Sequence, residues 1–130
     1  MTLTPPDPSP RIIPAAEMAA AFAKGGSFIE NSEYRVGLAR RDGGGEAEIH
    51  DVDTDIFYVL EGAATLVLGG EMVEPRSVGP NETRAASTRG GEAKSVAKGD
   101  VIVIPRGVPH WFSAVTEAPF VYLVVKSTAR

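Results

Sequence analysis

Residues 99–112 read GDVIVIPRGVPHWF, an apolar run that leads into a tight turn and then into an aromatic segment. Two prolines and a glycine fix the turn, because proline restricts the backbone and glycine permits conformations that other residues avoid. The pattern predicts strands over Val101–Ile104 and Trp111–Val115, with His110 at the start of the second. A histidine at such a place is either a packed, hydrogen-bonded residue or a metal ligand.

A second stretch, residues 48–62, reads EIHDVDTDIFYVLEG. Residues two apart in a strand point to the same face, so Glu48 and His50 point together. Asp55 opens the next strand after a short polar turn and can return a carboxylate to the same place. The simpler interpretation of this stretch is a hairpin with an acidic turn.

Together, the two stretches resemble the two sequence motifs of the cupin family. The first motif runs glycine, five residues, His-x-His, three or four residues, Glu, six residues, Gly. A glycine within residues 43–45 opens it here at a spacing slightly different from five residues. Glu48 replaces the first histidine, His50 matches the second, Asp55 replaces the glutamate, and Gly62 ends it.

The second cupin motif runs glycine, five residues, Pro-x-Gly, two residues, His, three residues, Asn. Gly99, Pro105, Gly107 and His110 match every spacing, and Ala114 replaces the asparagine. Both histidines of the chain therefore fall on motif positions. The resemblance implies an all-β fold, a cupin β-barrel or double-stranded β-helix (jelly roll), with a metal inside the barrel.

The ligand set implied by the resemblance is Glu48, His50, Asp55 and His110. Two imidazoles with carboxylates suit a divalent metal ion such as Fe(II), Zn(II), Mn(II), Ni(II) or Co(II). If Glu48 does not ligate, the other three form the two-histidine, one-carboxylate triad of non-haem Fe(II) oxygenases. An unligated Glu48 or Asp55 would be a catalytic acid or base. The alternative is a site that has lost its metal and keeps both carboxylates for hydrogen bonding or proton transfer.

The chain divides into a proline-rich N-terminal arm, residues 1–11, and a cupin domain, residues 12–130. A short helix is predicted within Ala15–Ala23, with an apolar stripe that Gly25 and Gly26 end. The interval Gly69–Ala93 is predicted to be a long loop, because its hydrophobic pattern lapses. The other predicted strands are Tyr34–Arg40, Ala47–His50, Ile56–Leu60, Ala64–Leu68, Val96–Ala97 and Phe120–Lys126.

Strand parity also predicts which side chains line the pocket. Phe57 and Val59 share the face of Asp55, and Phe112 shares the face of His110. Tyr58 and Trp111 should face the other layer, where the hydroxyl and the indole N–H need partners. The arginines considered for an anionic substrate are expected instead to be solvated surface charges: Arg35, Arg40, Arg41, Arg76 and Arg106.

The composition excludes several classes of protein. The 130 residues form one domain with a formal net charge of -4, which argues against a nucleic-acid partner. The chain has no cysteine, so thiolate catalysis, disulfides and iron–sulfur clusters are excluded. No apolar run approaches a membrane span, and we expect a cytoplasmic protein.

The function expected from the resemblance is a small-molecule metalloenzyme of dioxygenase or oxidoreductase type. The alternatives are a metal-dependent isomerase, lyase or cyclase, or a non-catalytic cupin that binds a small ligand. A homodimer is expected, as cupins often form one.

Overall fold

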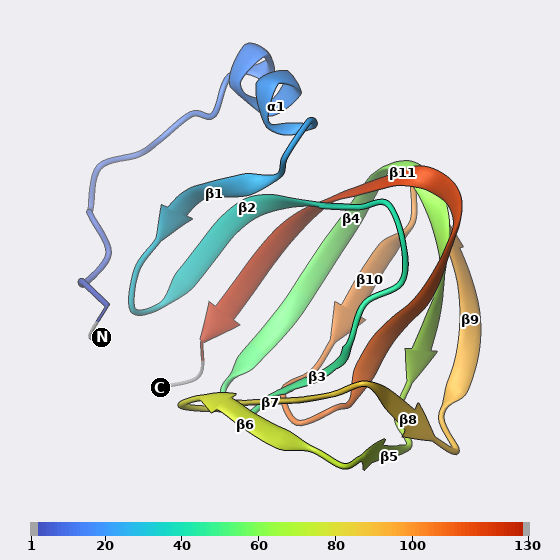
Figure 1. Cartoon of the computed structure of the whole chain (residues 1–130). Helices are drawn as coiled ribbons and strands as arrows, with labels where there is room; N and C mark the ends of the chain where they lie inside the picture. Colours follow the sequence, from blue (N-terminus) through green and yellow to red (C-terminus); the bar gives the residue numbers. More distant parts are fainter. Residues whose placement is uncertain (1–2, 129–130) are drawn as a thin grey trace.

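The computed structural model describes residues 3–128, which form a curled, predominantly β structure with one short helix near the N-terminus (Figure 1). Nine strands belong to one sheet, and β5 and β8 form a separate two-stranded sheet. Within residues 3–128, no helix is long and apolar enough to cross a membrane. The elements are α1 (Ala15–Ala21), β1 (Gly26–Glu30), β2 (Tyr34–Arg41), β3 (Ala47–His50), β4 (Asp53–Leu68), β5 (Glu71–Val73), β6 (Arg76–Gly79), β7 (Glu82–Ala85), β8 (Ser87–Arg89), β9 (Glu92–Ala97), β10 (Val101–Ile104) and β11 (His110–Thr128). The all-β cupin architecture with a short N-terminal helix is as predicted.

Two long, bent strands, β4 and β11, run antiparallel and make up the centre of the sheet (Figure 1). The sequence predicts two strands in the place of each, so the predicted break at Gly62 is wrong: the chain bends there and the strand continues. Gly62 has φ 79°, and a Cβ at this position would collide with the carbonyl oxygens of Glu117 and Pro119. Glycine therefore allows β4 to bend while β11 lies against it.

The predicted long loop over residues 69–93 is also wrong, because it contains β5, β6, β7, β8 and the start of β9. The hydrophobic pattern fails here because these strands lie at the rim: all four residues of β6 are exposed. Asn81, with φ 65°, makes the tight turn from β6 to β7. Polar strands of this kind pair through their backbones and leave no apolar alternation in the sequence.

The N-terminal region contains one predicted helix and one strand that the sequence did not predict. The helix α1 is found within the predicted interval, and none of its residues is buried. Its apolar stripe and Leu60 line an open groove of about 460 Å³. The following strand, β1, pairs antiparallel with β2.

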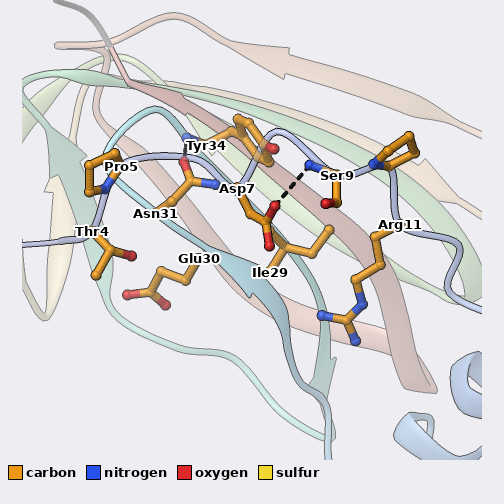
Figure 2. A pocket seen from close by; sticks show the side chains of 10 residues that line it. Thr4, Pro5, Asp7, Ser9, Arg11, Ile29, Glu30, Asn31 and Tyr34 are labelled. Carbon is orange, nitrogen blue, oxygen red and sulfur yellow. Dashed lines mark hydrogen bonds between the residues drawn. The ribbon is translucent and has the colours of Figure 1, made fainter.

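Residues 3–14 form no helix or strand and run along β1 (Figure 2). Thr4 accepts a hydrogen bond from the backbone N–H of Ser32 at 2.8 Å, and Arg11 donates to the carbonyl of Phe28. A cavity of about 450 Å³ lies between this segment and β1. The first two residues of the predicted arm and the last two of the predicted domain lie outside the described residues, and the domain boundary stays a prediction.

The interior of the sheet is an aromatic cluster of Phe57, Phe112, Phe120 and Tyr122. Their ring centroids lie 4.8–6.0 Å apart at tilted angles, in the range where aromatic pairs attract. All four side chains are buried. This cluster packs against the polar residues described below.

The outer face of β4 and β10 exposes a patch of large apolar side chains. Val101 lies opposite Tyr58 and Val103 lies opposite Ile56, with exposed fractions of 36–63%. Tyr58 therefore points away from the interior, as its parity predicts. The indole N–H of Trp111 finds its partner in the carbonyl of Gly45 at 2.7 Å.

Candidate metal centre

Strand pairing brings the four motif residues together from three strands. Glu48 and His50 lie on β3, Asp55 on β4 and His110 at the start of β11. His110 is the cross-strand partner of Glu48. The Nε2 atoms of His50 and His110 lie 3.6 and 3.4 Å from Asp55 Oδ2. Residues that are far apart in the sequence therefore present their polar ends to one point.

The hydrogen bond of His110 identifies which of its nitrogens is free. Nδ1 lies 3.1 Å from the carbonyl of Val108, and a carbonyl only accepts, so Nδ1 carries the proton. Nε2 of the neutral ring then presents a lone pair to Asp55 Oδ2. Asp55 Oδ2 is buried and has no hydrogen-bond partner among the described residues. Two acceptors thus face each other with no donor between them.

A lysine occupies the other oxygen of the same carboxylate. Lys126 is the cross-strand partner of Asp55, and its Nζ donates to Asp55 Oδ1 at 2.7 Å. The same Nζ lies 3.4 Å from His50 Nε2. One ammonium group therefore lies beside both Asp55 and His50.

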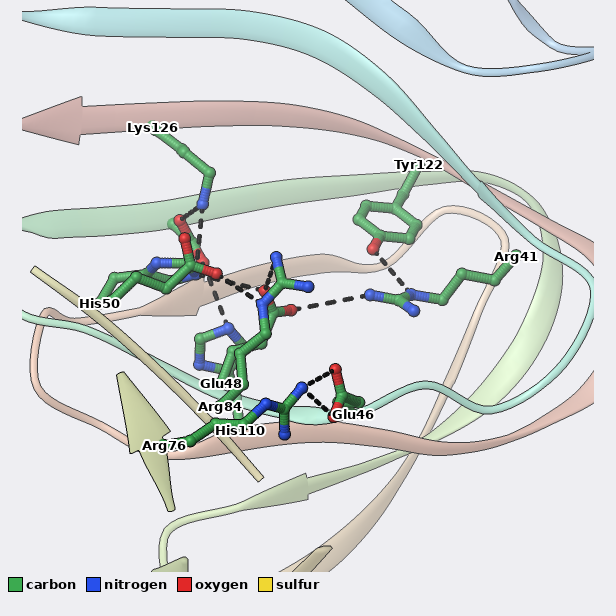
Figure 3. Close-up of polar contacts among 11 residues, drawn as sticks. Arg41, Glu46, Glu48, His50, Arg76, Arg84, His110, Tyr122 and Lys126 are labelled. Carbon is green, nitrogen blue, oxygen red and sulfur yellow. Dashed lines mark hydrogen bonds and ion pairs between the residues drawn. The ribbon is translucent and has the colours of Figure 1, made fainter. Parts of the chain in front are cut away.

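Glu48 lies near Arg41, Arg84 and His50 (Figure 3), and its contacts are longer than the 2.7 Å hydrogen bond to Asp55. Its Oε1 lies 3.3 Å from an Nη of Arg84 and 4.0 Å from His50 Nε2. Its Oε2 lies 3.8 Å from an Nη of Arg41. The carboxylate is therefore surrounded by positive charge without a short hydrogen bond to any of these groups.

One ligand atom each from Glu48, His50 and His110 lies within 4.8 Å of the other two. Metal–ligand distances are about 2.1 Å, so two ligand atoms on opposite sides of one ion lie about 4.2 Å apart. Small side-chain movements would therefore bring these three ligand atoms within bonding distance of one ion. The donors, two imidazoles and a carboxylate, match a divalent transition metal. The residues present fit a metal ion at this point, and Asp55 lies beside the three-residue set.

Burial shifts two pKa values at the site. Burial lowers the pKa of His110, against the hydrogen bond to Val108 and the charge of Asp55, which raise it. A neutral ring keeps the Nε2 lone pair available as a ligand. Burial also raises the pKa of Tyr122, whose hydroxyl accepts a hydrogen bond from Arg41 Nε at 3.1 Å.

The site lines a cavity of about 140 Å³. Phe57 and Phe112 line it, whereas Val59 does not: Val59 is buried in the adjoining core. The two arginines Arg35 and Arg41 also line the cavity, so the expectation that both are solvated surface charges is wrong. Arg41 extends from the end of β2 and its guanidinium packs over the ring of Phe112, 5.2 Å from the centroid.

Sequence reasoning also missed Lys126 and Tyr122, which line the same cavity. The signal was available in the alternation of the last strand. Tyr122, Val124 and Lys126 are two residues apart, so the face that buries the first two also carries the lysine inward.

A family model described as "Cupin" matches residues 24–130 of this chain. The chain belongs to the cupin family. None of the curated proteins compared with this cupin matches it.

Solved structures share the cupin fold at low identity. The protein BH2720 of Bacillus halodurans is 16% identical over 98% of this chain and 88% of its own, with a TM-score of 0.67. KdgF from Halomonas sp. is 18% identical over 82% of this chain and 78% of its own, with a TM-score of 0.57. The hydroquinone 1,2-dioxygenase of Sphingomonas sp. TTNP3, with 4-hydroxybenzoate bound, is 20% identical over 78% of this chain and 63% of its own, with a TM-score of 0.54. At these identities the similarity shows the fold alone.

Proposed function

We propose that this cupin is a divalent-metal-dependent enzyme of dioxygenase type that acts on a small molecule. The observation that carries the proposal is the convergence of one ligand atom each from Glu48, His50 and His110 beside the unpartnered Oδ2 of Asp55. Nε2 of His110 presents its lone pair to this buried oxygen, and Nε2 of His50 lies 3.6 Å from the same oxygen. Lys126 pairs with the other oxygen, Oδ1, so a cation at this point would give Oδ2 and the histidines a common partner.

The ligands in this proposal are His50, His110 and a carboxylate, either Glu48 or Asp55. When bound, the ion would supply Lewis-acid polarisation of the substrate and, as Fe(II), reactivity toward dioxygen. The two-histidine, one-carboxylate set supports the oxygenase type.

The chain's own residues have separate roles in this proposal. The carbonyl of Val108 orients the ring of His110 by holding its Nδ1 proton. Lys126 neutralises Asp55. The aromatic side chains of Phe57 and Phe112 keep one wall of the cavity dry.

The test is elemental analysis of freshly purified protein beside His50→Ala and His110→Ala. The proposal predicts stoichiometric metal in the wild type and loss of it in both variants. Asp51→Asn is the control, because Asp51 follows His50 in the chain and has an exposed side chain. Full metal content in either histidine variant would contradict the shared site.

Oxygen uptake tests the reaction type. Fe(II)-loaded protein should consume dioxygen in the presence of hydroquinone or a related phenol, and His110→Ala should not. Metal binding without uptake over a panel of phenols, diketones and thiols would reject the oxygenase assignment.

One observation favours a second candidate, a metal-dependent isomerase, lyase or cyclase. Glu48 lies beside the histidines yet makes no hydrogen bond shorter than the 3.3 Å contact to Arg84. It is therefore free to accept or return a proton while the other groups hold the ion. Turnover in the absence of dioxygen, lost in Glu48→Gln, would support this candidate.

We also propose a homodimer. The exposed apolar patch on β4 and β10 supports it, because large apolar patches on a surface are typical of interaction sites. Light scattering should give the mass of a dimer for the wild type and the mass of a monomer for the double variant Val101→Lys/Val103→Lys.

A further inference from the structure

The lining of the cavity carries more positive than negative side chains. Arg35, Arg41 and Lys126 line it against Glu48 and Asp55. Lys126 and Asp55 form a pair at 2.7 Å and cancel. Arg35 has a carboxylate of its own outside the lining, Glu30 at 3.7 Å, so Arg41 is left facing Glu48.

Arg41 is a cation of this lining with unused hydrogen-bonding capacity beside Glu48. Its Nε donates to the hydroxyl of Tyr122 at 3.1 Å. Within residues 3–128, neither terminal nitrogen makes a hydrogen bond, and the contact to Glu48 at 3.8 Å is too long to be one. The side chain is 25% exposed. Both terminal NH2 groups are therefore available to a ligand.

The guanidinium of Arg41 is held in place on several sides. The ring of Phe112 lies under it at 5.2 Å, and the hydroxyl of Tyr122 fixes Nε. Gly45 leaves room for Nη1, since a Cβ at this position would collide with it. A guanidinium that is fixed before binding loses little conformational freedom when it meets a ligand.

A planar guanidinium with two free N–H groups matches the geometry of a carboxylate. We propose that Arg41 binds the carboxylate of a small organic acid in this cavity. Glu48 lies between the two sites: its Oε2 faces Arg41 and its Oε1 faces His50. Arg41, His50 and His110 line the same cavity, so a hydroxy- or oxo-carboxylate bound to Arg41 would direct its second oxygen toward the histidines if Glu48 moves aside. This last step rests on the proposed metal centre, whereas the contact with Arg41 does not.

The experiment uses matched pairs of probes, lactate with lactamide and benzoate with benzamide. Each is titrated calorimetrically into the full chain, both metal-loaded and after chelation. Each carboxylate should bind at least about tenfold more tightly than its amide, the size expected for charge-assisted hydrogen bonds. The preference should persist in the chelated protein.

Arg41→Gln should abolish the preference for the carboxylate, and Arg41→Lys should retain part of it, because lysine keeps the charge without the fork. Gly45→Ala should weaken carboxylate binding by displacing Nη1. The matched control is Arg40→Gln: Arg40 precedes Arg41 but pairs with Asp42 at 3.1 Å, away from the cavity lining. Arg40→Gln should bind like the wild type.

The results separate this proposal from the proposed function. Metal content that depends on His50 and His110, with equal binding of carboxylates and amides, would overturn the role of Arg41 alone. Carboxylate preference in a wild-type protein that takes up no metal would support Arg41 and count against the metal centre. If Arg41→Gln lost both its metal and its preference for the carboxylate, Arg41 would act through Glu48. That result would overturn the direct contact between Arg41 and the carboxylate.

Discussion

Asp55 and Glu48 both lie beside His50, yet their surroundings hold the two carboxylates very differently. The side chain of Asp55 is 2% exposed and accepts a 2.7 Å hydrogen bond from Lys126. The side chain of Glu48 is 18% exposed, and its two arginine neighbours lie at 3.3 and 3.8 Å. The carboxylate of Asp55 is therefore held in place by its surroundings, whereas the side chain of Glu48 can move to bind an ion or a proton.

The substitution with the largest expected effect removes the cation from Asp55. Lys126→Met leaves a buried carboxylate without its partner, so the metal-free protein should lose about 3 kcal/mol of unfolding free energy. Added Zn(II) or Mn(II) should restore more stability to this variant than to the wild type, because the ion becomes the only cation at Asp55. Urea unfolding with and without metal measures both effects. A loss below about 0.5 kcal/mol would contradict the fixed role of Asp55.

A smaller loss is expected when the charge of Asp55 itself is removed. Asp55→Asn leaves Lys126 unpaired, but that side chain is 17% exposed and reaches water more easily. We expect a loss of about 2 kcal/mol in the same unfolding experiment. The double variant Asp55→Asn/Lys126→Met should be more stable than Lys126→Met alone, since it leaves no buried charge. If the two single effects simply add, the residues are not coupled.

The smallest effect on stability is expected at Glu48. Its contacts are long and partly exposed, so Glu48→Gln should change the unfolding free energy by less than about 1 kcal/mol. Metal affinity, measured by competition with a chromogenic chelator, should nevertheless fall by at least about tenfold. The matched control is Glu46→Gln: Glu46 pairs with Arg76 at 2.6 Å and is not part of the metal cluster. Equal affinity of both variants would exclude Glu48 as a ligand.

The sequence predicts the site residues that directly follow a short turn. His110 and Asp55 each follow a turn whose length matches a cupin motif, so the resemblance implies their places. Lys126 lies near the end of β11, and Arg41 lies at the end of β2, just before the first motif. Only the alternation of inward- and outward-facing side chains identifies these two residues, and the alternation must be followed along the whole strand.

The fold was predictable where burial leaves an alternating pattern. The interior strands carry that pattern, and the rim strands β5–β8 do not: β6 is fully exposed, and most residues of β5, β7 and β8 are only partly buried. Glycine was informative but ambiguous. Gly62 predicts a change of direction, and only the approach of Pro119 from β11 shows that the strand bends rather than ends.

The pairing of β4 with β11 has a consequence for how the chain tolerates changes in length. The register is regular from Asp53 and Thr128 to Val59 and Tyr122, and it shifts repeatedly around the bend. An inserted residue in the regular part would turn Asp55 outward and Ile56 into the cavity. At the bend, existing bulges can absorb one more residue. Insertions and deletions over evolutionary time should therefore gather near Gly62 and residues 113–119, leaving the metal-binding end of the barrel in register.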